Sequence, residues 1–95
     1  MSHFVYILAS RPHGAIYVGA ARDLRLRVEQ HRSNAVSGHT RKYNIKILVW
    51  LEMHETMAAA LLREKQIKRW RRAWKDELIE KLNPNWDDIC ADIPF

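Results

Sequence analysis

The stretch "FVYILASRPHGAIYVGA", residues 4–20, decides the fold of this chain. Two apolar runs rich in Val, Ile, Phe and Tyr stand on either side of the turn-forming sequence "RPHG", residues 11–14. This pattern predicts two strands, residues 3–10 and 15–20, that pair as a β-hairpin. Each strand carries one tyrosine, so the pairing register decides whether the two tyrosines meet.

The register follows from the parity of the hairpin. With a four-residue turn, Ser10 faces Ala15 and the numbers of paired residues sum to 25. Tyr6 and Tyr17 then lie on the same face as diagonal neighbours within reach of each other. Gly19 faces Tyr6 in this register, and leaves space beside the tyrosine hydroxyl where a ligand can approach. The two tyrosines are therefore either a packed cross-strand pair or two parts of a ligand site.

The middle of the chain predicts one helix, one loop and one strand. Asp23 is suited to be the N-cap of a helix that runs from Leu24 to about Ser33. The polar residues 34–43 predict a loop, and residues 45–54 predict a third strand. The apolar residues that alternate on one face of this strand are Ile45, Ile47, Val49, Leu51 and Met53.

Two helical patterns complete the chain, from Thr56 to Trp70 and from about Ala73 to Leu82, where Pro84 stops the second. The residues expected to face the core are Met57, Ala60, Leu61, Ile67 and Trp70 in the first, and Trp74, Leu78 and Leu82 in the second. The order β-β-α-β-α-α predicts a single α/β domain over residues 1–95. Its architecture is a small sandwich, with a three-stranded antiparallel sheet flanked by helices.

The composition limits the possible functions. The chain has 95 residues, of which 47% are apolar, and a formal net charge of +5, which favours an anionic partner such as nucleic acid. The single cysteine, Cys90, excludes a disulfide framework, and no run is suited to span a membrane. The N-terminus lacks the pattern of a signal peptide, so we expect a cytoplasmic protein without a membrane partner. Neither a histidine metal motif, a nucleophile elbow nor a phosphate-binding glycine loop is present.

Three residues on the predicted helices are candidates for chemistry. Arg27 and His31 are four residues apart, so they share a helical face and border the apolar stripe. They are either a phosphate-binding donor and a proton carrier or part of a solvated basic face. Glu64 falls within the apolar stripe of a later helix, where a carboxylate needs a partner. That partner is either a core arginine or lysine, or a divalent cation.

The segment after Glu64 is strongly basic. Of its eleven residues, "KQIKRWRRAWK", six are basic and none is acidic. Such a segment is suited to sequence-independent contact with a phosphate backbone. We interpret Trp70 and Trp74, which interleave with the basic residues, as core anchors rather than base-stacking platforms. The basic residues are Lys65, Lys68, Arg69, Arg71, Arg72 and Lys75.

Together these residues resemble the GIY-YIG nuclease superfamily, and in particular its short stand-alone members. The resemblance covers residues 3–86, and it depends on the order and spacing of several residues rather than on one motif. "FVY" stands where the family name implies "GIY", and Ala20 and Ala21 stand where many members carry a polar or basic residue. The matching residues are Tyr6, the "YVG" of Tyr17–Gly19, Arg27, His31, Glu64 and Asn83.

The resemblance implies a metal-dependent endonuclease that hydrolyses phosphodiester bonds. A single Mg²⁺ or Mn²⁺ ion on Glu64 would hold a phosphate oxygen and stabilise the leaving oxygen. Arg27 would neutralise charge that grows on the phosphoryl oxygens. One of Tyr6 or Tyr17, with its pKa lowered by the cation and Arg27, would deprotonate or orient the attacking water. The products would be a 3′-hydroxyl and a 5′-phosphate.

The remaining residues take supporting roles in this scheme. His31 would assist proton movement or hydrogen-bond a tyrosine, and Asn83 would contact phosphate or brace the site. Tyr43 and Lys46 are further candidates for contact with the nucleic-acid backbone. The basic residues expected to bind nucleic acid are Lys68, Arg69, Arg71 and Arg72.

The expected partner is DNA, in repair or recombination, and the protein is expected to be a monomer or a weak homodimer. Two other functions stay open on the same fold. One is a nucleic-acid-binding module that performs no chemistry, and the other is an interaction module of a repair complex. Metal-dependent nicking of DNA separates the endonuclease from both.

Overall fold

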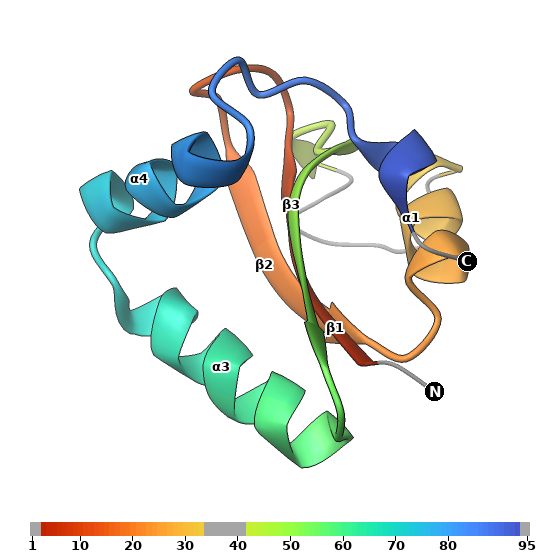
Figure 1. Cartoon of the computed structure of the whole chain (residues 1–95). Coiled ribbons are helices and arrows are strands. Elements are labelled where there is room, and N and C mark those ends of the chain that lie inside the picture. Colours follow the sequence, from red (N-terminus) through yellow and green to blue (C-terminus); the bar gives the residue numbers. More distant parts are fainter. Residues whose placement is uncertain (1–2, 34–41, 94–95) are drawn as a thin grey trace.

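The computed structural model describes residues 3–33 and 42–93, whose elements follow the predicted order with one short 3-10 helix added (Figure 1). The predicted three-stranded antiparallel sheet flanked by helices is confirmed. Most of the loop predicted over residues 34–43 lies outside the described residues. The elements are β1 (His3–Ala9), β2 (Ile16–Ala21), α1 (Leu24–Arg32), β3 (Ile47–His54), α3 (Met57–Arg69), α4 (Arg72–Leu82) and η1 (Cys90–Asp92).

The hairpin has the predicted register. Tyr6 pairs with Gly19, and the amide of Ser10 donates a 2.9 Å hydrogen bond to the carbonyl of Ala15. The hydroxyl of Ser10 in turn accepts a 3.0 Å bond from the amide of Ala15, which closes the turn. Within the turn, His13 adopts a positive φ of 60°. The local sequence therefore fixes the pairing that places the two tyrosines.

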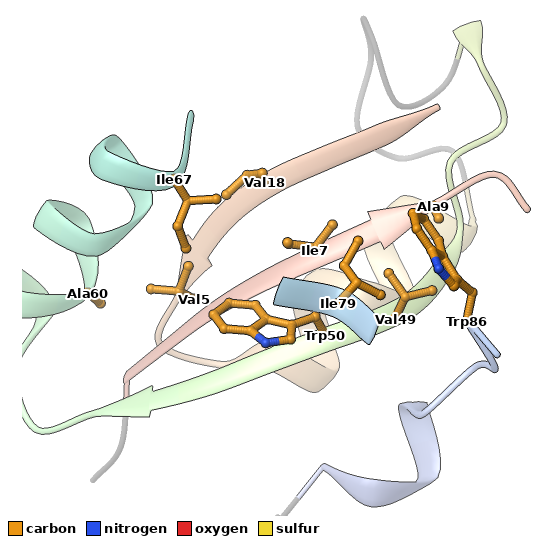
Figure 2. Close-up of a cluster of buried hydrophobic side chains, with 10 residues drawn as sticks. All are labelled: Val5, Ile7, Ala9, Val18, Val49, Trp50, Ala60, Ile67, Ile79 and Trp86. Carbon is orange, nitrogen blue, oxygen red and sulfur yellow. The ribbon is translucent and has the colours of Figure 1, made fainter. Parts of the chain in front are cut away.

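The strand order is β2-β1-β3, which puts β1 in the centre and leaves β2 and β3 as edges. Helices α3 and α4 cover one face of the sheet, here called the α3/α4 face, and α1 with the C-terminal segment covers the other, the α1 face (Figure 1). Figure 2 shows the cluster on the α3/α4 face, which includes Val5, Ile7, Ile67, Ile79 and Trp86. The cluster on the α1 face includes Phe4, Tyr6, Leu8, Leu24, Val28 and Ile93.

The prediction that β3 buries a single alternating face was wrong. The strand begins at Ile47, and Leu48 pairs with Leu8 whereas Trp50 pairs with Ile7, so the register shifts between these pairs. The extra residue, Val49, packs in the same cluster as Trp50, and Leu48 packs on the opposite face. Because helices cover both faces of the sheet and a bulge interrupts the alternation, period-two counting along the strand fails.

The helices begin and end close to the predicted residues. The carboxylate of Asp23 accepts a 3.0 Å bond from the amide of Leu26 and caps α1. The hydroxyl of Thr56 accepts a 3.1 Å bond from the amide of Ala59 and caps α3. Both caps satisfy amides that have no partner within the helix.

Three of the predicted core positions in α3 and α4 are exposed. Leu61 and Leu82 are about half exposed, and Trp74 is 47% exposed, whereas Ile79 is fully buried. The backbone of Trp70 is extended, with φ −69° and ψ 148°, so α3 ends there and α4 starts a new helical phase. The predicted residues Trp74, Leu78 and Leu82 all lie within α4, and the face that α4 buries contains Ile79, one residue after Leu78. The interpretation of Trp74 as a core anchor was therefore wrong.

Candidate active site

Three rings meet on the α1 face beside the edge strand β2. The ring centroids of Tyr6 and Tyr17 are 6.3 Å apart, and those of Tyr17 and His31 are 5.3 Å apart. The hydroxyl of Tyr6 lies 3.4 Å from Nε2 of His31, which is buried. The sheet and α1 thus bring together two tyrosines and a histidine that are far apart in sequence.

Gly19 makes room for this arrangement. A Cβ at Gly19 would lie 2.5 Å from the hydroxyl oxygen of Tyr6 and 2.9 Å from Cε2 of Tyr17. These distances are too short for any side chain at this position, so the rings lie directly against the backbone of β2. The sequence predicted that Gly19 leaves space for a ligand beside the hydroxyl of Tyr6, but in the structure the ring of Tyr6 itself fills this space.

Burial and charge set the protonation states of this cluster. Tyr6 is 1% exposed, and desolvation raises its pKa well above the ordinary value, which Tyr17 and Glu64 raise further and Arg27 partly lowers. Desolvation, followed by the charge of Arg27, lowers the pKa of His31. Tyr6 therefore stays protonated, and the expectation that Arg27 lowers the pKa of the reacting tyrosine does not describe Tyr6, where burial outweighs it. His31 is neutral at physiological pH and can accept a proton.

Arg27 supplies a positive charge next to this cluster. Its side chain is exposed on α1, and its charge acts on both Tyr6 and His31. No carboxylate within the described residues forms an ion pair with Arg27. Arg27 is thus accessible to an anion that approaches the rings from solvent.

Glu64 reaches the same region from α3. Its side chain is 18% exposed, and its charge acts on Tyr6. Its Oε2 lies 3.4 Å from Nζ of Lys68, one turn further along α3. The sequence left open a core salt bridge or a cation, and the structure supplies a lysine that is itself 49% exposed rather than a buried partner.

This carboxylate fits a magnesium-type ion. No group of three or more His, Cys, Asp or Glu side chains suited to hold a metal occurs within residues 3–33 and 42–93. Mg²⁺ does not require such a group, because it commonly keeps several waters and binds one or two carboxylates together with substrate phosphates. Among the described residues, the only ion-pair partner of Glu64 is Lys68, which is 49% exposed, so the carboxylate can be released to a cation. We therefore treat Glu64 as the residue that would hold the ion.

The site has two halves, the three rings with Arg27 on the α1 face and Glu64 with Lys68 on α3, and these halves meet around β2. Tyr17 packs with the cluster on the α1 face, whereas α3 covers the opposite face. Nζ of Lys68 nevertheless lies 5.8 Å from the ring centroid of Tyr17, because β2 is the edge of the sheet and α3 packs against it. Groups from both faces thus converge at this edge of the described sheet.

Asn83 lies at the C-terminal end of α4 and is buried. Its Nδ2 donates to the carbonyls of Val49, at 3.0 Å, and Asp87, at 2.8 Å, and its Oδ1 accepts a 3.1 Å bond from the amide of Asp87. The side chain joins β3 to the segment after α4. This geometry favours the bracing role over contact with phosphate.

Tyr43 and Lys46 lie on the segment that leads into β3. Tyr43 is about half exposed, and Nζ of Lys42 lies 5.5 Å from its ring centroid. The carbonyl of Lys46 accepts a 3.1 Å bond from Nε of Arg32 on α1. Neither side chain is linked by these contacts to the three-ring cluster, and their proposed contact with nucleic acid stays a prediction.

The basic segment is not a uniform surface. Arg72 donates a 2.6 Å bond to the carbonyl of Gly14 and a 2.7 Å bond to Asp76, so it holds the hairpin turn against α4. The guanidinium of Arg71 lies 4.9 Å from the ring centroid of Trp74. Arg69 and Lys65 are exposed on α3 and have no ion pair among the described residues. The side chains that remain accessible for phosphate are therefore those of α3 rather than Arg72.

Sequence reasoning missed the position of Lys68 within the site. It placed Lys68 only in the basic segment, although the four-residue spacing from Glu64 on one helix predicts their contact. The proximity of Lys68 to Tyr17 has no local signal, because it depends on how α3 packs against the edge of the sheet.

The fold is a small α/β domain whose candidate site lies at the edge strand β2. Residues 2–77 match the family model described as the GIY-YIG catalytic domain. The chain belongs to this family, as its resemblance had predicted.

Curated relatives agree with this assignment. The UPF0213 proteins SAV0488 and SA0446 of two Staphylococcus aureus strains are each 40% identical over 80 residues, which cover 84% of this chain and 96% of theirs. The solution NMR structure of the UPF0213 protein BH0048 from Bacillus halodurans has a TM-score of 0.57 and 26% sequence identity, and the match covers 93% of both chains. No helix in the described part of the chain is long and apolar enough to cross a membrane.

Proposed function

We propose that this protein is a divalent-metal-dependent endonuclease that hydrolyses phosphodiester bonds of DNA. The observation that carries the proposal is the convergence of Tyr6, Tyr17, His31, Arg27 and Glu64 at the β2 edge. When bound at Glu64, a Mg²⁺ or Mn²⁺ ion supplies Lewis-acid stabilisation of the phosphate and the leaving oxygen. The net charge of +5 supports an anionic substrate.

Each side chain has a role that its surroundings support. Arg27 binds a non-bridging phosphate oxygen and neutralises the charge that grows there. Tyr17, which is less buried than Tyr6, orients the attacking water through its hydroxyl. His31 is neutral because its pKa is lowered, so it accepts the proton that leaves the water through Tyr17. Tyr6 stays protonated and holds His31 through their 3.4 Å contact.

The reaction breaks one bond and forms one bond. The water oxygen attacks phosphorus and gives a proton to His31, the bond from phosphorus to the 3′-oxygen breaks, and the 3′-oxygen takes up a proton from solvent, so a 5′-phosphate and a 3′-hydroxyl result. Orientation of the water and the phosphate by fixed groups supplies much of the rate enhancement in such reactions.

The decisive test is incubation with supercoiled, branched and single-stranded DNA in Mg²⁺ or Mn²⁺. We expect nicking that requires the metal and is lost in Glu64→Gln. The matched control is Glu77→Gln, an exposed carboxylate on α4, which is expected to leave nicking unchanged. Binding that depends on salt but yields no nicking with any substrate contradicts the endonuclease and favours a binding module.

A further inference from the structure

The ammonium group of Lys68 occupies the space between the two halves of the site. It lies 3.4 Å from Oε2 of Glu64 and 5.8 Å from the ring centroid of Tyr17. Glu64 has no other ion-pair partner among the described residues. A cation therefore already neutralises the carboxylate that is suited to hold a metal.

This ion pair is poorly explained as a device for stability. Lys68 is 49% exposed, and exposed pairs one helical turn apart contribute little to the free energy of unfolding. Lys68 also has a long, flexible stem, so its ammonium can move several ångströms without disturbing α3. The contact between Lys68 and Glu64 is thus easy to break. Its effect is on which cation the carboxylate of Glu64 binds, rather than on stability.

We infer that Lys68 couples the binding of a divalent cation to the binding of nucleic acid. This inference rests on the proposed function, because it takes Glu64 as the metal ligand and a phosphodiester as the substrate. In the free protein Lys68 competes with the divalent cation for Glu64. A phosphate at the site attracts the ammonium of Lys68 away from the carboxylate, and Glu64 then binds the cation more tightly.

Two physical arguments support this coupling. A divalent cation and an ammonium group repel each other, so both cannot be held within hydrogen-bond distance of one carboxylate without a large electrostatic penalty. Arg27 adds a further positive charge next to the rings, which disfavours the metal until an anion arrives. Because coupling between two ligands is reciprocal, the metal must also raise the affinity for nucleic acid by the same factor.

The test measures Mn²⁺ affinity by titration calorimetry in Lys68→Gln and in the wild type, without nucleic acid. We expect the dissociation constant to fall by roughly two- to fivefold in the variant, the range that corresponds to loss of an exposed ion pair. Lys65→Gln is the matched control, because Lys65 is exposed on the same helix and borders the same groove as Glu64 and Lys68. It removes the same charge but is expected to leave the Mn²⁺ affinity within twofold of the wild type.

The second arm adds a short DNA duplex in the Arg27→Ala background, so that the duplex stays intact. We expect the duplex to tighten Mn²⁺ binding more in Arg27→Ala alone than in Arg27→Ala combined with Lys68→Gln. Lys68→Arg keeps the charge, so in the same background the duplex is expected to tighten Mn²⁺ binding as much as it does when Lys68 is present. Circular dichroism of each variant checks that the fold is retained.

The outcomes separate the inference from the function on which it rests. If Glu64→Gln abolishes Mn²⁺ binding but Lys68→Gln and Lys65→Gln bind equally, the coupling is wrong and the metal site stands. If Glu64→Gln leaves Mn²⁺ binding unchanged, the metal is not at Glu64 and the inference falls with the proposed site. Cleavage assays of the same variants report on the function independently.

Discussion

The ring of Tyr6 lies against the backbone of Gly19, so that a Cβ at Gly19 would be 2.5 Å from the tyrosine hydroxyl oxygen and 2.6 Å from Cζ. Tyr6 is on the central strand, and its cross-strand partner Gly19 is on the edge strand. Because Gly19 has no side chain, the buried ring of Tyr6 can reach the rings of Tyr17 and His31.

Gly19→Ala is expected to displace Tyr6, to reduce cleavage strongly and to destabilise the fold by about 1–3 kcal/mol, as overpacking does. Urea melts and nicking assays measure the two effects. Combination with Tyr6→Ala, which removes the ring, is expected to make the stability losses non-additive. Losses that simply add would mean that Gly19 and Tyr6 act independently.

Arg27→Ala is expected to abolish cleavage while retaining most DNA affinity. One phosphate contact among several is lost, but so is the charge that stabilises the transition state. The control is Arg22→Ala, which removes an exposed arginine just before α1 and is expected to cleave normally. Cleavage by Arg27→Ala at the wild-type rate would exclude the proposed mechanism.

Glu64→Gln is expected to change the free energy of unfolding in EDTA by less than about 1 kcal/mol, because the partner of Glu64 is the exposed Lys68. Mg²⁺ or Mn²⁺ is expected to stabilise the wild type against urea but not the variant. A penalty of roughly 3–5 kcal/mol in EDTA would instead indicate a buried salt bridge.

Neutralisation of Lys65 and Arg69 to Gln is expected to weaken DNA binding for all sequences and to reduce the dependence of log affinity on log salt. Arg72→Gln is expected to act differently, because Arg72 bonds to Gly14 and Asp76 and holds the hairpin turn. It should lower stability in urea melts more than it lowers the salt slope. An unchanged slope in the double variant would place the nucleic-acid surface outside α3.

His31 predicts how stability depends on pH. Its pKa is lowered from 6.5 in the folded state, mainly by burial, so below pH 6.5 the unfolded chain binds more protons at this residue. The contribution of neutral His31 to the free energy of unfolding is therefore fully present above pH 6.5. It is lost as the pH falls toward the pKa of His31 in the folded state. Urea melts between pH 8 and 5 are expected to show a steeper loss in the wild type than in His31→Gln. Parallel curves would contradict a depressed pKa.

The features that were predicted best from the sequence are those that a few neighbouring residues determine, namely the hairpin register and the helix starts. The turn fixed the pairing of Tyr6 with Gly19, and side-chain caps at Asp23 and Thr56 marked the two helix starts. These features depend on a few neighbouring residues, so a single sequence contains the information.

Features that depend on packing between distant segments were not predictable in the same way. The bulge at Val49 reverses the alternation of β3, and the packing of α4 against the sheet buries Ile79 rather than Trp74. The position of Lys68 against Tyr17 likewise depends on how α3 crosses the edge strand. The identity of the site residues came from a resemblance, and their geometry from the tertiary structure.

The central position of β1 has a consequence for the order of folding. Its pairing with β2 closes a short turn, between Ala9 and Ile16, whereas its pairing with β3 brings together His3 and His54. Because closure of a longer loop costs more entropy, we expect the hairpin to form first and β3 to dock later. The two tyrosines are then assembled early, while Glu64, which follows β3 in the chain, reaches them only after the slower long-range step. A partly folded chain would thus carry the aromatic half of the site before it acquires the carboxylate.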